Sequence, residues 1–404
     1  MPFARTAPLR EELERALPER PFTVRFWDGT VLPATDGAGT GPTFTARAPA
    51  AVAHCLLAPG QLGLGRAYAT GVLQVDDLDA VLRLLGKWQP PPIDRKVRLR
   101  LVRAAVRACG ISRPPRRPAA ELRPRGERHS IARDARAVRH HYDVSNEFFE
   151  LFLGSSLTYS CGIFSRGATT LEEAQEAKLE MVCSKLGLQE GDRVLDVGCG
   201  WGSFAMHAAT NHGANVVGIT LSEPQAALAM RRVRDAGLAD RVQIRVADYR
   251  EMRGETFDSI ASIGMVEHVG EEQIDVYAQQ LAGLLRPGGR LLNHGIATLS
   301  HSPAGPFSDR YVFPDAQPLQ LWRVLKALEA AGFRADHVEG FPDDYAETLR
   351  HWARRLDSRL EEAVRLAGPE RVRVWRLYLR AARNGFETGF TSIYQANCLL
   401  QADR

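Results

Sequence analysis

Short apolar runs alternate with helical patterns along the second half of the chain. Five runs rich in β-branched residues predict strands: RVLDVGC, ANVVGITL, RVQIRVADY, FDSIASIGM and RLLNHGIA. Helical periodicity is present in SFAMHAATNH, PQAALAMRRVRDAG, EEQIDVYAQQLAGLL and LQLWRVLKALEAAG. This alternation favours an α/β fold with a parallel sheet and crossover helices. A long arginine-rich helical stretch from about Tyr345 to Arg383 follows, and FTSIYQANCLL could supply a final strand.

The first part of the chain has a different pattern. Over residues 21–73 the runs FTVRFWDGTVL, PTFTARAP and AVAHCLLAPG alternate with turn residues, which predicts a small strand-rich unit. GLGRAYATGVLQVDDLDAVLRLLGKW is predicted to be helical and to end near Trp88, because three prolines follow. We therefore expect a small N-terminal mixed α/β domain at 1–110, a basic Pro/Arg-rich linker at 111–130 and a main domain at 131–404.

Composition and length narrow the class of protein. A chain of 404 residues has room for about two domains, and 45% hydrophobic with 25% charged residues argues against wholesale disorder, a collagen-like repeat or a membrane bundle. Six cysteines without a CxxC pair favour neither zinc nor a disulfide scaffold, so no metal site is expected. No run approaches the roughly 18 apolar residues of a membrane span. The expected location is cytoplasmic, at most peripheral at the inner face of the membrane, and a homo-oligomer stays open.

A basic segment joins the two parts. Residues 94–128 hold twelve Arg or Lys and three acidic residues, although the net charge of the whole chain is only +4. A solvated linker is one interpretation. Contact with anionic lipid headgroups is another, because Val97, Leu101, Val102 and Ala105 can share one helix face flanked by arginines. Nucleic acid is not an expected partner, since no aromatic residues interleave these charges for stacking.

A glycine-rich turn follows the first strand of the main domain. In VLDVGCGWG, residues 194–202, glycines let the backbone approach a bound ligand at the carboxyl end of the strand, where open α/β sheets bind nucleotides. The spacing is G-x-G-x-G and not the G-x-G-x-x-G of dinucleotide folds. A hydride-transfer enzyme is therefore the second choice.

Three features occur together: the glycine turn preceded by Asp196, a second strand GITLS, and a third strand ending in DY. This combination resembles the class I methyltransferases, which bind S-adenosylmethionine. The resemblance implies a Rossmann-like domain with Gly198 and Gly200 at the methionine portion of the cofactor. It places the next segments at the ribose and adenine: Thr220, Leu221, Gln225, Asp248 and Tyr249. Each has a simpler explanation, since Thr220 could be a turn residue, Gln225 a helix-surface residue and Tyr249 a core aromatic.

Four further segments make the resemblance more specific: HHYDVSNEFFELFLGSSLTYSCGIF, GMVEHVG, NHGIAT and DDYAETL. From about residue 140 to the C-terminus, the set is similar to the cyclopropane-fatty-acyl-phospholipid synthase family, including the mycolic-acid cyclopropane synthases and the tuberculostearic-type fatty acyl C-methyltransferases. It implies that 131–404 is an S-adenosylmethionine-dependent catalytic domain, and that Tyr159, Ser160 and Ile263 also contact the cofactor. The implied reaction adds a carbon to a cis double bond in a phospholipid acyl chain.

The resemblance also implies a bound bicarbonate ion as the base. Cys161 and Ile296 would hold it through backbone atoms, and Glu267, His294 and Tyr345 through side chains. We refer to these five residues as the proposed cage. Taken singly, His294 could be a satisfied core histidine, Glu267 a helix-start residue and Cys161 a small buried hydrophobe. His140, His141 and Tyr142 are weaker pocket candidates.

The chain departs from the family pattern in ways that bear on the product. The strand that usually reads L-H-T-I-G is NHGIA at 293–297, the customary G-G-x-L-P-S is replaced at 315–319, and Ala382 stands where several members have a cysteine. Loss of a proton from the added methyl group gives a cyclopropane, and loss from the neighbouring chain carbon gives a 10-methylene branch. Both products stay open. Two further alternatives are a methyltransferase for a soluble small molecule and a catalytically silent lipid-binding module.

Overall fold

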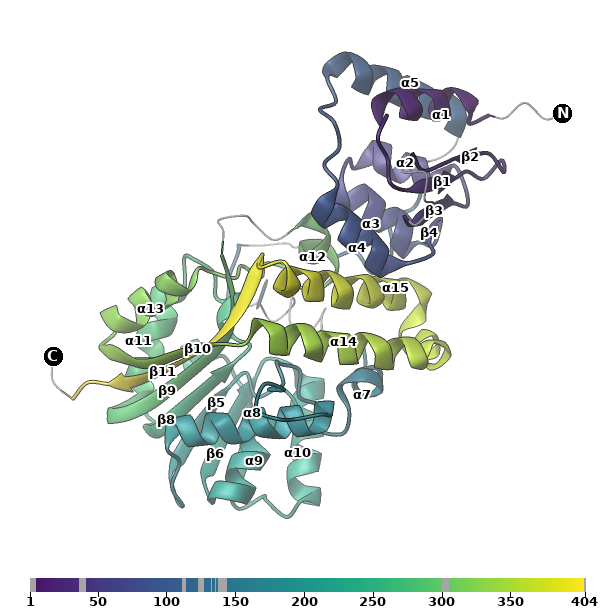
Figure 1. Cartoon of the computed structure of the whole chain (residues 1–404). Helices are drawn as coiled ribbons and strands as arrows, with labels where there is room; N and C mark the ends of the chain where they lie inside the picture. Colours follow the sequence, from purple (N-terminus) through teal and green to yellow (C-terminus); the bar gives the residue numbers. More distant parts are fainter. Residues whose placement is uncertain are drawn as a thin grey trace. The chain divides into compact units, whose positions relative to one another are not determined.

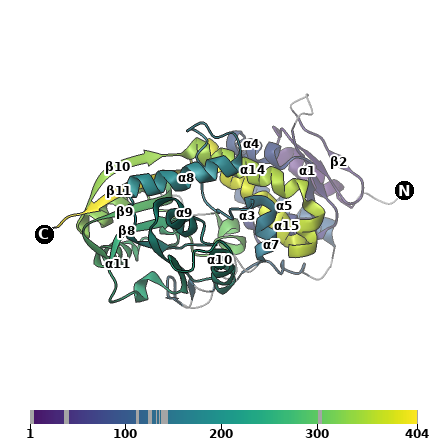
Figure 2. The same cartoon turned by 90° about the horizontal axis from the view of Figure 1, so that it is seen from below.

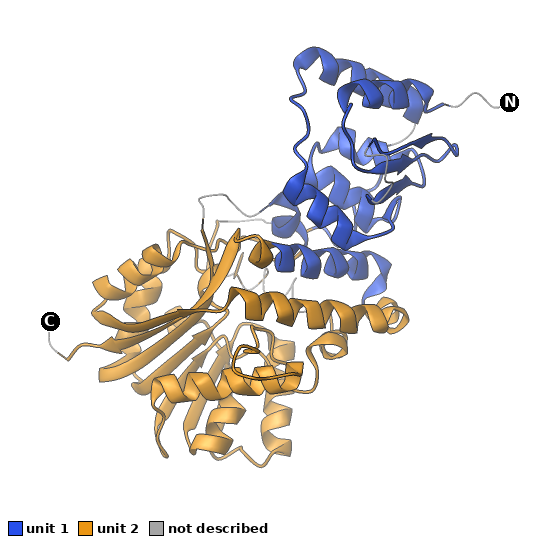
Figure 3. Cartoon of the chain, in the orientation of Figure 1, with its two compact units in different colours: residues 1–121, 305–311, 367–384 blue, residues 122–304, 312–366, 385–404 orange. Residues whose placement is uncertain are grey.

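The computed structural model describes residues 5–35, 41–110, 114–122, 127–131, 133–134, 136, 144–299 and 305–402. The chain forms two compact units, which Figure 3 distinguishes by colour. One contains Met1–Glu121, Gly305–Tyr311 and Ala367–Asn384, and the other contains Leu122–Ala304, Val312–Leu366 and Gly385–Arg404. The first unit thus includes two short segments from within the range expected for the main domain.

The second unit is built around one large sheet. Its strands are β5 (Arg193–Val197), β6 (Asn215–Thr220), β7 (Val242–Val246), β8 (Phe257–Ile263), β9 (Leu285–Thr298), β10 (Phe333–Gly340) and β11 (Thr391–Leu400). They lie in the order β10-β11-β9-β8-β5-β6-β7 (Figure 1). The five strands predicted from apolar runs form and are parallel, and the predicted final strand is β11, antiparallel to β9. The strand order reverses at β5, which is where such sheets bind ligands.

Helices cover both faces of this sheet. The helices of this unit include α8 (Leu171–Leu186), α9 (Ser203–His212), α10 (Glu223–Asp235), α11 (Ile274–Leu284), α13 (Leu321–Ala330) and α14 (Pro342–Ser358), while α7 (Asn146–Leu153) packs on α14 and α10. Successive strand residues point to opposite faces, so Val194 packs with α8, α9 and α10, whereas Leu195 packs with α11 and α13. In Figure 2, α8 lies along one side of the sheet and α11 along the other. The α/β prediction is confirmed.

Two details of this unit differ from the sequence prediction. β10 was not expected, because FRADHVEG is largely polar and exposed, and it forms as an edge strand on β11. The arginine-rich tail is two helices, α14 and α15 (Leu360–Glu387), and α15 is itself interrupted at Gly368, whose φ is 76° and which precedes Pro369. Glycine in this conformation followed by proline breaks a helix.

The first unit is a smaller mixed α/β structure, as expected. Its elements are α1 (Ala7–Ala16), β1 (Thr23–Arg25), β2 (Val31–Leu32), β3 (Thr43–Ala46), α2 (Ala50–Leu57), α3 (Gln61–Ala69), β4 (Leu73–Val75), α4 (Leu78–Lys87), α5 (Arg95–Cys109) and α12 (Pro306–Tyr311). The sheet has the order β2-β1-β3-β4, and only β1 and β3 are parallel within it.

Two local predictions in this unit were wrong. AVAHCLL, expected within a strand-rich region, is helix α2: it lacks apolar/polar alternation, and its buried residues Ala51 and His54 stand three apart, as on one helix face. The helix expected to continue to Trp88 is divided by β4, because Gly71, with a φ of 78°, follows α3 and allows the chain to turn and pair with β3.

The basic helix α5 presents an apolar face that differs in part from the predicted one. Ala105 is buried with Ala104 and Ala108 in the core of the first unit. The exposed apolar side chains are Leu99, Val102 and Val106, at 50%, 39% and 55%, so that Val102 is on the exposed face as predicted, while Val97 and Leu101 are half-buried. No helix in the described ranges is long and apolar enough to cross a membrane.

Candidate active site

The glycine turn closes the carboxyl end of β5. Gly198 and Gly200 have φ values of 80° and 55°, in the left-handed region that glycine adopts without strain. The backbone N–H groups of Gly198 and Cys199 both donate to the carbonyl of Ile219 on β6, at 3.0 and 2.9 Å. The turn is therefore fixed to the neighbouring strand before α9 begins, and it leaves the loop backbone facing a pocket.

The pocket encloses about 1320 Å³, its opening to solvent included. All eleven residues predicted to contact the cofactor line it: Tyr159, Ser160, Asp196, Gly198, Gly200, Thr220, Leu221, Gln225, Asp248, Tyr249 and Ile263. They come from the ends of four adjacent parallel strands and from the TYSC segment. The sheet topology thus brings together residues that are up to about a hundred positions apart.

Several polar side chains in this pocket are paired with one another, whereas Thr158 Oγ1 and Asp196 Oδ2 are buried without a hydrogen-bond partner among the described residues. At the end of β6, the Thr220 hydroxyl donates to Gln225 Oε1 at 2.9 Å and accepts from the Ser222 N–H at 3.2 Å. At the end of β7, Asp248 is 3% exposed, and its two oxygens accept from the Arg250 backbone N–H, Nε and Nη2 at 2.7–2.9 Å. These contacts fix both side chains in the absence of a ligand.

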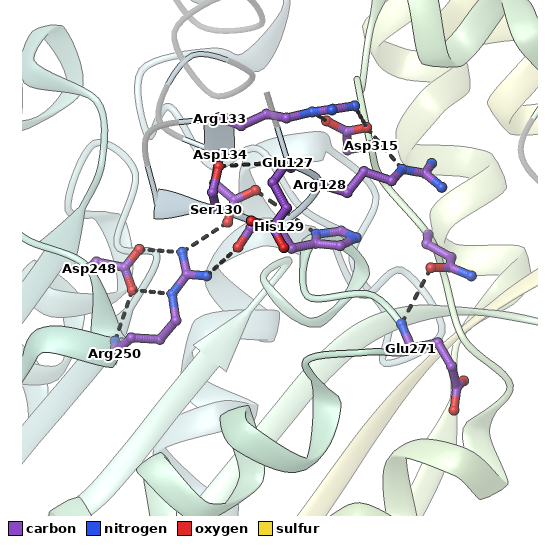
Figure 4. A network of polar contacts seen from close by, with 11 residues as sticks. Glu127, Arg128, His129, Ser130, Arg133, Asp134, Asp248, Arg250, Glu271 and Asp315 are labelled. Atoms are coloured by element: carbon purple, nitrogen blue, oxygen red, sulfur yellow. Dashed lines mark hydrogen bonds and ion pairs between the residues drawn. The ribbon is translucent and has the colours of Figure 1, made fainter. Parts of the chain in front are cut away.

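Arg250 also ties a preceding segment to the pocket (Figure 4). Its guanidinium donates to the carbonyl of His129 at 2.8 Å and to Asp134 at 2.9 Å. On the other side of the segment, Arg133 donates to both oxygens of Asp315 at 2.6 Å. Asp315 stands in the stretch that departs from the family pattern, and it has a φ of 64°. Asp134, Arg250 and Asp315 all line the pocket.

The motifs upstream of the glycine turn contact it directly. Ser145 caps α7 by accepting from the N–H of Phe148 at 3.1 Å. The next residue, Asn146, accepts through Oδ1 from the Trp201 indole N–H at 2.8 Å. Ser203 then donates to the carbonyl of Ser156 at 2.6 Å. The segments SNxFF and GCGWG, which are distant in the sequence, are thus joined by hydrogen bonds in the fold.

A buried lysine lines the pocket. Lys178 on α8 is 1% exposed and Asp196 on β5 is 2% exposed. Burial lowers the pKa of Lys178 to about 8 and raises the pKa of Asp196 to about 7, and the attraction between the two opposes both shifts. Sequence analysis missed Lys178 and Arg250. Each is a common surface residue type, and only the packing of α8 on the sheet and the turn after β7 reveal their positions.

Glu267 lies between the pocket and β9. It belongs to a 3₁₀ turn, Val266–His268, that follows the pocket residues Gly264 and Met265. Burial raises the pKa of its carboxyl to about 7, against hydrogen bonds from the backbone of Glu267 and Ile296. Its Oε2 is buried and has no hydrogen-bond partner among the residues described.

Gly295 makes the close approach of Glu267 to β9 possible. A Cβ atom on Gly295 would lie 2.2 Å from Val266 Cγ1 and 3.3 Å from Glu267 Oε2. No real side chain tolerates the first distance without movement of Val266. The family's threonine at this position would thus require a different arrangement of the turn.

His294 is fully buried on β9, between β8 and β11. Within the described part of the chain, neither of its ring nitrogens has a hydrogen-bond partner. Burial and, secondarily, the positive charges of Lys178 and Lys185 lower its pKa to about 3, so the imidazole is neutral. A satisfied core histidine, the simpler explanation, does not match these two free nitrogens.

Cys161 and Tyr345 meet at one backbone carbonyl. The Tyr345 N–H donates to the carbonyl oxygen of Phe341 at 3.1 Å, and the buried Cys161 thiol lies 3.8 Å from the same oxygen. The N–H of Phe341 donates to Ile393 at 3.0 Å, and Ile393 pairs with Ile296 across β11 and β9. The thiol pKa of Cys161 is raised by burial, which makes a thiolate at this place unfavourable.

The five residues of the proposed cage therefore lie on connected elements, but none is among the residues that line the pocket. Ser160 and His268, which adjoin Cys161 and Glu267 along the chain, do line it. Aromatic rings join the two regions, since Trp352 lies 5.2 Å from the pocket residue Tyr159 and 6.1 Å from Tyr345, between ring centroids. His140, His141 and Tyr142 lie outside the described residues.

Comparison with known proteins agrees with this arrangement. A family model described as mycolic acid cyclopropane synthetase matches residues 129–396. A probable fatty acid methyltransferase of Mycobacterium tuberculosis is 39% identical over 389 residues, which cover 93% of this chain and 90% of the relative. A tuberculostearic acid methyltransferase of the same organism is 30% identical over 398 residues, with 95% and 88% covered.

The fold has a close counterpart among solved structures. Mycolic acid cyclopropane synthase CmaA1, complexed with SAH and CTAB, is 33% identical and superposes with a TM-score of 0.63 over 66% of this chain and 98% of that chain. The resemblance derived from motifs and the Rossmann-like fold class are thereby confirmed, and the hydride-transfer alternative is set aside. The chain belongs to the mycolic acid cyclopropane synthetase family and is a methyltransferase of the cyclopropane synthase type.

Proposed function

We propose that the protein transfers a methyl group from S-adenosylmethionine to the cis double bond of an unsaturated acyl chain in a membrane phospholipid, with bicarbonate as the base. One observation carries the proposal: beside the pocket, Glu267 and His294 are buried polar side chains with atoms that no described residue satisfies. Such groups are costly unless a ligand binds them. A small polar ion fits their chemistry, because a carboxyl and an imidazole N–H can both hydrogen-bond to its oxygens.

The residues of the pocket suit the cofactor. S-adenosylmethionine supplies an electrophilic methyl group when it is bound. Gly198 and Gly200 would leave room for its methionine portion, and Thr220, Gln225 and Asp248 are held ready at the strand ends that would receive the ribose and adenine. In the reaction, the alkene π electrons form the new carbon–carbon bond as the sulfur–methyl bond breaks, and a cation remains on the acyl chain.

The proposed cage would then hold the base next to that cation. These residues would hold bicarbonate, and the ion would supply a base for the proton that the acyl chain loses. Glu267, with a pKa raised to about 7, can accept or donate a hydrogen bond toward it, while His294 contributes a neutral N–H donor. The backbones of Cys161 and Ile296 and the Tyr345 side chain complete the cage. The π faces of Tyr345 and Trp352 stabilise a nearby cation without reacting with it.

For the product, we propose the 10-methylene branch of the tuberculostearic type in preference to the cyclopropane. The relatives whose matches cover 93% and 95% of this chain have names of fatty acid and tuberculostearic acid methyltransferases, while a cyclopropane mycolic acid synthase matches 65%. Gly295, in place of the family's threonine, also changes the contact between β9 and Glu267. This alters the surroundings of the base, which decides the carbon that loses its proton.

Helix α5 would bring the enzyme to its substrate. Leu99, Val102 and Val106 form an exposed apolar stripe, and exposed arginines such as Arg98 and Arg103 flank it. An apolar stripe with basic borders suits the surface of an anionic bilayer. We propose that this surface docks the protein peripherally on the inner face of the cytoplasmic membrane.

The test is methyl transfer from labelled S-adenosylmethionine to vesicles of unsaturated phospholipid, followed by mass spectrometry of the released acyl chains. We expect a methylene product. Ozonolysis cleaves the double bond of a methylene branch, whereas a cyclopropane ring resists ozonolysis. Absence of any transferred label would support the silent lipid-binding module. Equal rates on a soluble short-chain alkene would support the small-molecule alternative.

The docking surface has its own measurement. Activity on anionic vesicles should fall as salt rises and should be low on neutral vesicles. Leu99→Ser with Val106→Ser should reduce binding to anionic vesicles several-fold, whereas Leu57→Ser, at a residue 61% exposed in the same unit, should not. Salt-insensitive and equal activity on both vesicle types would contradict docking by α5.

A further inference from the structure

A cluster of metal-binding side chains lies between α8 and α9, outside the proposed cage and the pocket. Glu180 and Cys183 are three residues apart on α8, and His207 and His212 come from α9. One oxygen of Glu180, Oε2, lies 3.2 Å from His207 Nε2 and 3.0 Å from His212 Nε2. The ligand atoms of Cys183, His207 and His212 all lie within 4.8 Å of one another. The thiol and the two imidazoles thus converge on one point, and the Glu180 carboxylate borders it by contacting both imidazoles.

We propose that these four residues bind one divalent transition-metal ion, with zinc as the best match. Zinc bonds of about 2.0–2.1 Å to nitrogen or oxygen and about 2.3 Å to sulfur place ligand atoms of a tetrahedron roughly 3.3 to 3.6 Å apart. The two distances from Glu180 to the imidazoles are already close to this spacing. The separations among the thiol and the two imidazoles, at most 4.8 Å, need a contraction of about 1 Å or less, and the half-exposed Glu180 side chain would turn toward the thiol. Thiolate and imidazole ligands favour zinc over magnesium or calcium.

The charges of the site balance. On binding, the thiol would lose its proton to solvent and form the sulfur–zinc bond as a thiolate. One thiolate and the Glu180 carboxylate then neutralise the two positive charges of the ion. A neutral site avoids the cost of an uncompensated charge beside the buried core that contains Cys183.

A neighbouring amide supports one ligand. Asn211 Nδ2 lies 3.0 Å from His207 Nδ1 and 3.3 Å from His207 Nε2, and the two orientations of an amide are interchangeable by a flip of its plane. With its oxygen turned toward the ring, Asn211 would accept from Nδ1–H and leave Nε2 free to bind the ion. Metal-bound histidines commonly have such an acceptor behind them.

The site would have a structural role, because four protein ligands leave no open position for a substrate. It would join α8, which carries Lys178, to α9, whose first residues Ser203 and Phe204 line the pocket. A search for CxxC or HxxxH motifs does not find the cluster, because the ligands on α8 and those on α9 are 24 or more positions apart along the chain. This is why we expected no metal site from the sequence.

The test uses the full chain without a histidine tag, under a phosphine reductant. We expect about one zinc per chain by elemental mass spectrometry, and on replacement by Co²⁺ a sulfur-to-cobalt charge-transfer band in the near ultraviolet. Cys183→Ala should abolish that band, and His212→Ala and Glu180→Gln should weaken Co²⁺ binding at least about tenfold. Cys398→Ala, at a buried cysteine on β11, and His337→Ala, on β10, are controls that should bind as the wild type does.

The proposal fails if the wild-type chain binds neither ion, or if His212→Ala and Glu180→Gln bind Co²⁺ as tightly as wild type does. These two variants change side chains that are 20% and 49% exposed, so they should fold even if Cys183→Ala does not. Metal content and the cobalt spectrum do not depend on methyl transfer. A failed metal site and a failed methyltransferase assignment are therefore separate results.

Discussion

The cofactor pocket and the proposed cage differ in how far their buried polar side chains are paired within the protein. In the pocket, Thr220 is hydrogen-bonded to Gln225, and Asp248 is held by Arg250. In the cage, Glu267 Oε2 and both nitrogens of His294 have no partner within the described chain. The pocket is thus held by internal hydrogen bonds at the ends of β6 and β7, although Asp196 Oδ2 at β5 is buried without a partner among the described residues. The cage is organised around groups that only a ligand would satisfy.

This difference separates two kinds of binding. A pocket with internally paired side chains gains affinity from a preformed shape, because little has to be ordered when the ligand binds. Unpaired buried groups instead reduce the stability of the folded protein until they are occupied. The cage therefore resembles a catalytic centre, where groups needed for the reaction lower the stability of the folded protein.

The largest effect is expected in the cage. Glu267→Gln or His294→Ala should slow turnover by roughly 10²–10⁴-fold, since each removes a group that positions the base, while cofactor affinity should stay within about twofold. Single-turnover methyl transfer and calorimetric titration with S-adenosylmethionine measure the two quantities. Glu251→Gln, at an exposed residue of the neighbouring turn, is the control. Unchanged rates in both cage variants would remove the cage from the mechanism.

The stability cost of the cage gives a second prediction. The pKa of Glu267 is raised from 4.5 to about 7, so between these values the folded state binds more protons than the unfolded state, and the free energy of unfolding falls as pH rises. The full penalty, present above pH 7, is at most about 3 kcal/mol. Glu267→Gln removes it.

Urea unfolding at pH 5, 6, 7 and 8 measures this effect. The Gln variant should gain stability relative to wild type as pH rises, because Asp196, whose pKa is also raised, is common to both proteins and cancels in the difference. The free energy of unfolding of Glu251→Gln should change with pH as that of the wild type does. A constant difference between the Glu267→Gln and wild-type curves at all four pH values would mean that the buried carboxyl does not carry this penalty.

The paired pocket should respond in affinity. Arg250→Ala leaves the buried Asp248 carboxylate without its main donor and frees Asp134, so the Kd for S-adenosylmethionine should rise roughly tenfold, with a smaller change in kcat. The Kd of Arg250→Lys should lie between those of the wild type and Arg250→Ala, since one ammonium group cannot replace the several contacts of the guanidinium. Arg253→Ala, at an exposed arginine nearby, is the control. Equal affinities for the two alanine variants would show that Asp248 needs no support.

The same contrast explains what the sequence could predict. The parallel strands and the glycine turn depend on local patterns, and those predictions were confirmed. β10 was missed because an edge strand with little burial lacks an apolar signal, and α2 was misjudged because a short apolar run does not distinguish a strand from a helix. The unpaired state of His294 and the burial of Lys178 depend on packing between distant elements, which no local pattern encodes.

The smallest effect concerns the bond between the upstream motif and the glycine turn. Trp201→Phe removes the 2.8 Å hydrogen bond to Asn146 and keeps an aromatic ring in place, so S-adenosylmethionine affinity should fall only a few-fold, about 1 kcal/mol. Asn146→Ala should have a similar effect. If the bond is what couples the two motifs, the double variant should be no weaker than either single one. Additive losses of binding free energy in titration calorimetry would mean instead that Trp201 and Asn146 support the pocket independently. The glycine turn would then depend on contacts other than this hydrogen bond.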